Sequence, residues 1–295
     1  MPNRLKSIQH ISNLFIAIVC SLVFMLLCVL LIIQLTLFNP KYMKQIIEKS
    51  NYTTHLTQEI NQEIENLGLA SNIPSGVLNN SVRKKIVEKN ILDYFSSIYT
   101  GKNYSFRGIK ELDNSIRIKV TNYADKTDSE ISEINLMNLE KNAHQVVKKY
   151  IELPYLATYG KKMTDFQFVF FLLIGGTLVT MITLFWILLY LLKGYLHRLL
   201  RNISYLFVST GLFLIMCSGV LIYFKVFERI AIMSKALYKF IYLYLVTFNS
   251  YFLYTGIFCI IVGICVAILS EKNRNYLIEK NRNYLIKKKL QERLN

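Results

Sequence analysis

Residues 11–38 read ISNLFIAIVCSLVFMLLCVLLIIQLTLF, an apolar run without a single Asp, Glu, Lys or Arg. A bilayer core is crossed by about 20 consecutive apolar residues, so this stretch is long enough to span one. Three more charge-free stretches follow at 166–192, 203–224 and 240–270. The sequence therefore predicts an all-α membrane protein with four transmembrane helices.

The composition excludes several classes of protein. Of the 295 residues 53% are hydrophobic and 18% charged, with a mean hydropathy of +0.32, whereas soluble domains are roughly a quarter charged. All five cysteines lie within the charge-free stretches and none lies in the segment 39–165, so a disulfide framework for that segment is excluded. Soluble globular proteins, disordered proteins and secreted disulfide scaffolds do not fit this pattern.

The orientation follows from the basic residues near the spans, which are retained on the cytoplasmic side. Thirteen Lys and Arg flank the spans on the side of the N-terminus, and four lie between the third and fourth spans. The net charge of +16 is then a signal of topology rather than of nucleic-acid binding. The first stretch is too long for a cleaved signal peptide and is expected to be a retained anchor. The expected order is a cytoplasmic N-terminus (1–10), TM helix 1 (11–38), an extracytoplasmic helical domain (39–165), TM helix 2 (166–192), a cytoplasmic connection (193–202), TM helix 3 (203–224), a short outer loop (225–239), TM helix 4 (240–270) and a basic cytoplasmic tail (271–295).

Apolar residues at helical spacing indicate that the segment 39–165 is a small helical bundle. The repeats are Leu56, Ile60, Ile64 and Leu67, then Val87, Ile91, Phe95 and Ile98, and later Leu139, Ala143 and Val147. Basic residues at 83–89 lie at the start of the second repeat. We expect their charges to interact with the acidic residues Glu59, Glu63 and Glu65.

Two further features of this segment concern residues 115–121 and 127–130. Ile116, Ile118 and Val120 alternate with charges as in a strand, yet residues 112, 116 and 120 also form a helical stripe, so residues 115–121 fit either a strand or a helix. A helix is favoured because an isolated strand has nothing to pair with. Residues 127–130 have the spacing of a capping box and predict the start of the last helix.

Small and polar residues inside the spans predict close helix packing, because they let backbones approach. The candidates are Gly176, Thr180, Thr183, Gly211, Ser218, Asn249, Gly256 and Gly263. In the basic tail, cations are expected to contact anionic lipid headgroups. These candidates are Lys280, Arg282, Lys287, Lys288 and Lys289.

No motif for catalysis or phosphate binding occurs, and the charge-free stretches hold none of the charged groups that intramembrane enzymes and proton-coupled transporters need at depth. We therefore expect a protein that is not an enzyme and has no cofactor or metal. His55 and His144 could still meet in the bundle, beside Glu59 or Glu140, as a metal or pH-sensing site.

The layout of the spans resembles that of the four-span permeases that partner ABC ATPases in cell division and export. The resemblance covers topology only, and it departs at 193–202, where those permeases carry a longer coupling segment. The first hypothesis is a bacterial plasma-membrane protein that acts as an accessory, sensing or docking subunit through its outer domain. The alternative is a transport component, either a permease-like subunit or an oligomeric pore. The expected partners are the lipid bilayer and another membrane protein or a second copy, and nucleic acid is not expected.

Overall fold

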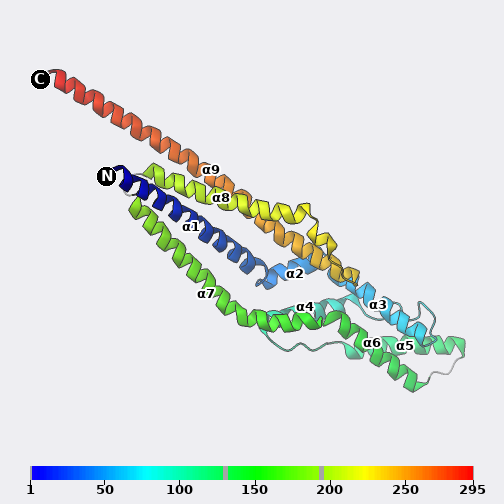
Figure 1. Ribbon diagram of the computed structural model, residues 1–295. Helices are drawn as coiled ribbons and strands as arrows, with labels where there is room; N and C mark the ends of the chain where they lie inside the picture. Colours follow the sequence, from blue (N-terminus) through cyan, green and yellow to red (C-terminus); the bar gives the residue numbers. More distant parts are fainter. Residues whose placement is uncertain (1, 129–131, 193–195, 295) are drawn as a thin grey trace. The chain divides into compact units, whose positions relative to one another are not determined.

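A computed structural model describes residues 2–128, 132–192 and 196–294, and every regular element within these ranges is a helix (Figure 1). The predicted all-α class is thereby confirmed. The elements are α1 (Pro2–Thr36), α2 (Pro40–Lys49), α3 (Tyr52–Ala70), α4 (Lys84–Thr100), α5 (Ile109–Thr127), α6 (Glu133–Ile151), α7 (Pro154–Leu191), α8 (Leu196–Tyr223), the 3-10 helix η1 (Val226–Arg229) and α9 (Lys235–Leu294).

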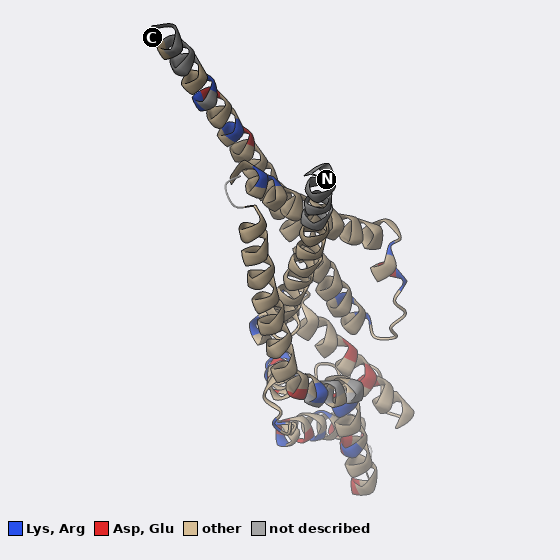
Figure 2. Cartoon of the chain, turned by 60° about the vertical axis from the view of Figure 1, so that its left-hand side comes forward, with Lys and Arg blue, Asp and Glu red and all other residues tan. Residues whose placement is uncertain are grey.

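Four helices are long and apolar enough to cross a membrane. Their apolar parts lie at Phe15–Thr36 in α1, Lys162–Leu191 in α7, Leu196–Tyr223 in α8 and Lys235–Leu285 in α9. Figure 2 shows long uncharged stretches on these helices, while Lys, Arg, Asp and Glu gather on the other helices and on the last part of α9. The prediction of four membrane-spanning helices is confirmed at this level.

The chain forms two compact units. Unit 1 comprises Met1–Ile33, Phe171–Val226 and Phe248–Asn295, and unit 2 comprises Gln34–Phe170 and Phe227–Thr247. Helix α9 supplies residues to both. Residues 227–247, which the sequence predicts to belong to the short outer loop and TM helix 4, lie in unit 2 in the structure.

Unit 2 is built on the apolar faces that the sequence indicates. Leu56, Ile60 and Ile64 of α3 are at most 1% exposed and pack in one core with Val87 and Ile91 of α4. The chain bends between α2 and α3 at Asn51, which has a φ of 50°. Asparagine tolerates this left-handed conformation better than most residues, so α2 and α3 are separate helices.

Residues 115–121 lie within helix α5, which decides the alternative that the sequence left open. Leu112, Ile116 and Val120 are buried, whereas Ile118 is 60% exposed. The strand-like alternation therefore reflects one apolar residue on the outer face of a helix.

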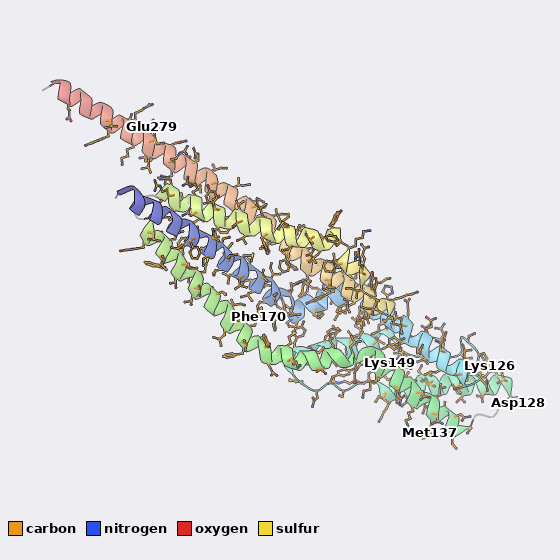
Figure 3. The ribbon with its side chains drawn as sticks, viewed as in Figure 1. Lys126, Asp128, Met137, Lys149, Phe170 and Glu279 are labelled. Carbon is orange, nitrogen blue, oxygen red and sulfur yellow. The ribbon has the colours of Figure 1, made fainter. Side chains whose placement is uncertain are left out.

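The capping box predicted at 127–130 is wrong at its first residue. Thr127 is the last residue of α5 and its hydroxyl donates to the carbonyl of Tyr123 at 2.9 Å. Its neighbours Lys126 and Asp128 are labelled in Figure 3. Residues 129–131 lie outside the described ranges, and α6 begins at Glu133 after Ser132.

Two buried asparagines hold the loops of unit 2. The amide of Asn61 donates to the carbonyl of Val82 at 3.0 Å and accepts from its N–H at 2.8 Å. Asn90 does the same with Arg107, at 2.7 and 2.8 Å, and also accepts from the hydroxyl of Tyr104 at 2.9 Å. Both side chains use donor and acceptor together, which makes their burial tolerable.

Candidate functional site

The N-terminus of α9 is held by a carboxylate from α3. Glu59 accepts the hydroxyl hydrogen of Ser234 at 2.6 Å and the backbone N–H of Ala236 at 2.8 Å, one bond on each oxygen. Ser234 in turn accepts the N–H of Leu237 at 3.1 Å. The first N–H groups of a helix have no intrahelical partner and carry a partial positive charge, so a carboxylate there is favourable.

Aromatic side chains surround the next turns of α9. The ring of Phe240 is 5% exposed and lies 4.9 Å from the ring of Tyr52 and 5.7 Å from that of Phe95. Burial, then the Glu59 carboxylate and Tyr94, raise the pKa of Tyr52 above its ordinary value of 10.0. Helices α3 and α4 of unit 2 thus enclose the start of α9.

The enclosure continues along α9. The hydroxyl of Tyr42 donates to the carbonyl of Tyr244 at 3.3 Å, with the two rings 5.5 Å apart. We call Tyr42, Tyr52, Glu59 and Phe95 the α9 socket. It joins α2, α3 and α4 to the first three turns of the helix that continues to Leu294.

The sequence does not predict the α9 socket. It suggests that Glu59 balances the basic cluster at 83–89, but both oxygens of this carboxylate accept hydrogen bonds at the start of α9. A usable signal was present, because Ser234 is a good N-cap residue ahead of apolar residues at 236, 237, 240, 241 and 244. The uncharged run from Phe240 concealed it by making these turns look like part of a span.

A second feature, within unit 1, is the close packing of α8 against α9. A Cβ built on Gly211 would lie 2.6 Å from the carbonyl oxygen of Gly256, and one on Gly256 would lie 2.9 Å from that of Gly211. Ser204 donates to the carbonyl of Gly263 at 2.8 Å. Because partners rise in number along α8 and fall along α9, the two helices are antiparallel. Only small side chains permit this approach.

The packing face between α8 and α9 also contains Asn249, the one asparagine among the predicted packing residues. The amide of Asn249 donates to the carbonyl of Ser218, and the hydroxyl of Ser218 donates to the carbonyl of Asn249, both at 3.3 Å. The structure thus brings together five of the candidates from the sequence: Gly211, Ser218, Asn249, Gly256 and Gly263.

The three candidates on α7 are not brought against another described helix. A Cβ on Gly176 would meet nothing within 4 Å. The hydroxyls of Thr180 and Thr183 donate to carbonyls of their own helix, at Gly176 and Val179, each at 2.8 Å.

The tail candidates lie on the last part of α9. Lys280 and Arg282 are exposed there. Lys287, Lys288 and Lys289 belong to the same helix, but their side chains lie outside the described set. The described basic residues are therefore open to solvent or to a lipid surface.

The two histidines have different partners in unit 2. His144 lies 2.5 Å from the carboxylate of Asp113, whereas His55 lies 3.2 Å from the ammonium of Lys239. Across the described residues, no group of three or more His, Cys, Asp or Glu side chains has the arrangement of a metal site. The hypothesis of a joint His55–His144 site therefore gains no support from the geometry.

No protein-family model matches the chain, no curated protein is detectably similar to it, and no solved structure matches it.

Proposed function

We propose that this protein is a non-enzymatic accessory subunit of a bacterial plasma membrane, which senses or docks a partner through unit 2. In this proposal unit 1 lies in the bilayer, unit 2 is extracytoplasmic, and both termini are cytoplasmic. The four apolar helices and the excess of basic residues beside the spans on the N-terminal side support this arrangement. The partner is another membrane protein or a second copy of this chain.

The observation that carries the proposal is the α9 socket. Phe240 and the N-terminus of α9 belong to the packed core of unit 2, and the same helix continues unbroken into unit 1 and on to the basic tail. In this proposal α9 has two packing arrangements around Phe240. A partner that binds one arrangement more tightly shifts the equilibrium between the two, and α9 is shared by both units. It shifts that equilibrium only by the difference between its affinities for the two arrangements.

The proposal is tested by breaking the hydrogen bonds of the α9 socket and measuring the environment of the basic tail. In a cysteine-free background, an environment-sensitive fluorophore is attached to Cys in place of Lys280, and the protein is placed in lipid nanodiscs. Glu59→Ala removes both hydrogen bonds to the start of α9 and is expected to change the fluorophore's emission. Glu88→Ala, an exposed carboxylate on α4, removes the same charge and is expected to leave the emission unchanged. Equal emission from both variants, with helicity preserved, contradicts transmission through α9.

Topology and role are tested separately. A Cys placed at Ser75 is expected to react with an impermeant maleimide on intact cells, and one placed at Lys280 is expected to be spared. Labelling at 280 overturns the proposed orientation. Purification in mild detergent is expected to recover another membrane protein or a homo-oligomer. Solute flux through liposomes that contain the purified protein alone would instead establish a transport component.

A further inference from the structure

Unit 1 contains an apolar cavity of about 300 Å³ between α1, α7 and α8. Its walls are formed by Ala17 and Phe24 of α1, Met181 and Phe185 of α7, and Ile203 and Phe207 of α8, among others. An apolar cavity of roughly 150 Å³ already stays dry and accepts a ring as large as benzene. This cavity is twice that size, so water is a poor occupant and a hydrocarbon segment is a good one.

One end of the lining is polar. Among the described residues that line the cavity, Asn202 is the only one with an amide side chain. Arg198 precedes it by four residues on α8, so both side chains lie on the same face of the helix. A ligand that fills the cavity with hydrocarbon therefore meets an amide and a cation at the Leu196 end of α8.

We propose that this cavity binds one acyl chain of an anionic phospholipid, whose phosphate is bound by Arg198 and Asn202. Acyl chains are the apolar molecules available to a unit made of membrane-spanning helices. Hydrocarbon alone does not distinguish one phospholipid from another, so the preference for an anionic headgroup comes from Arg198. The proposal requires that unit 1 lies in the bilayer and is independent of the role proposed for unit 2.

The single tryptophan allows a direct test. Trp186 of α7 is 70% exposed, whereas its neighbour Phe185 lines the cavity. The double variant Phe185→Trp/Trp186→Phe moves the fluorophore into the cavity. Nanodiscs are prepared from phosphatidylcholine with small matched fractions of brominated phosphatidylglycerol or brominated phosphatidylcholine, whose bromine atoms quench nearby tryptophan.

In the double variant, brominated phosphatidylglycerol is expected to quench more strongly than brominated phosphatidylcholine. With Trp186 in place, both lipids are expected to quench alike, which also checks that unit 1 is in the bilayer. Arg198→Gln in the double variant is expected to reduce the preference for phosphatidylglycerol by roughly fivefold, the factor that corresponds to about 1 kcal/mol for one interfacial cation. Lys272→Gln, which removes an equal charge from an exposed position on α9, a helix whose described residues do not line the cavity, is expected to retain it.

Filling the cavity supplies the second arm. Ala17→Phe is expected to abolish preferential quenching in the double variant, whereas Ile18→Phe, on the exposed side of α1, is expected to preserve it. Equal quenching by the two lipids in the double variant overturns the proposal. So does a preference that survives both Arg198→Gln and Ala17→Phe.

Discussion

Ser218 of α8 and Asn249 of α9 bind each other's backbone, each side chain donating to the other residue's carbonyl at 3.3 Å. Asn249 is 3% exposed and Ser218 1%. An amide buried among apolar helices is costly unless it is hydrogen-bonded. This reciprocal pair satisfies both groups and fixes the register of α8 on α9.

Asn249→Ala is expected to lower the free energy of unfolding by about 1 kcal/mol, because interhelical hydrogen bonds in membranes contribute about 0.6 to 2 kcal/mol. Reversible unfolding of the purified protein in mixed micelles measures this. Thr183→Ala is the matched control, because that hydroxyl bonds within its own helix and its loss is expected to be neutral. An equal loss in both variants would show that the pair does not couple the helices.

The contact between Gly211 and Gly256 supports a second prediction. Gly211→Ala places a methyl group 2.6 Å from the Gly256 carbonyl oxygen, so the backbones must separate, at a cost of about 1–3 kcal/mol for overpacking. Gly176→Ala adds the same methyl group where nothing lies within 4 Å. That variant is expected to be neutral or slightly more stable, because alanine favours a helix over glycine by up to about 1 kcal/mol. The same unfolding measurement compares them, and equal stability of the two variants would contradict the close packing.

The difference between these glycines marks what the sequence can predict. A charge-free run identifies a span, because burial in lipid is a property of the run itself. Gly176, Gly211 and Gly256 each belong to a helical face of small residues in their own span, but which glycine meets a partner helix depends on how the helices are placed. Likewise, the spacing of apolar residues located the helices of unit 2, whereas the asparagine contacts at residues 61 and 90 depend on loops that sequence periodicity does not describe.

The start of α9 shows why a charge-free run alone does not mark the ends of a membrane span. Phe240 begins a charge-free run, yet its ring is buried among Tyr52 and Phe95. Aromatic and aliphatic residues satisfy a protein core as well as they satisfy lipid, so composition alone does not separate the two. Ser234, which lies before the run and donates to Glu59, shows that α9 begins within unit 2.

The buried phenol of Tyr52 predicts an alkaline dependence of stability. Its pKa is raised in the folded protein, first by burial and then by Glu59 and Tyr94. The folded state therefore holds this proton more tightly than the unfolded chain. The stabilisation is fully present below pH 10 and is lost as the pH rises above that value.

Tyr52→Phe removes this proton, so its stability is expected to fall less steeply above pH 10 than that of the wild type. Unfolding monitored between pH 8 and 12, together with tyrosinate absorbance, gives the two slopes. Tyr276→Phe changes a tyrosine that is 64% exposed and is expected to keep the wild-type slope. Identical slopes for Tyr52→Phe and the wild type would place the phenol in water.

The last prediction concerns the only cysteines whose thiols are in hydrogen-bond contact among the described residues, Cys28 of α1 and Cys259 of α9. Neighbouring thiols form a disulfide on two-electron oxidation, and the oxidant takes up the two electrons. Treatment with a membrane-permeant oxidant is expected to remove two of the five maleimide-reactive thiols measured after denaturation, with reversal by dithiothreitol.

Cys28→Ser and Cys259→Ser are each expected to prevent the loss. Cys20→Ser is expected to allow it, because the Cys20 thiol lies 3.8 Å from the sulfur of Met181 rather than beside another cysteine. Oxidation that proceeds equally in Cys28→Ser would contradict the packing of α1 against α9.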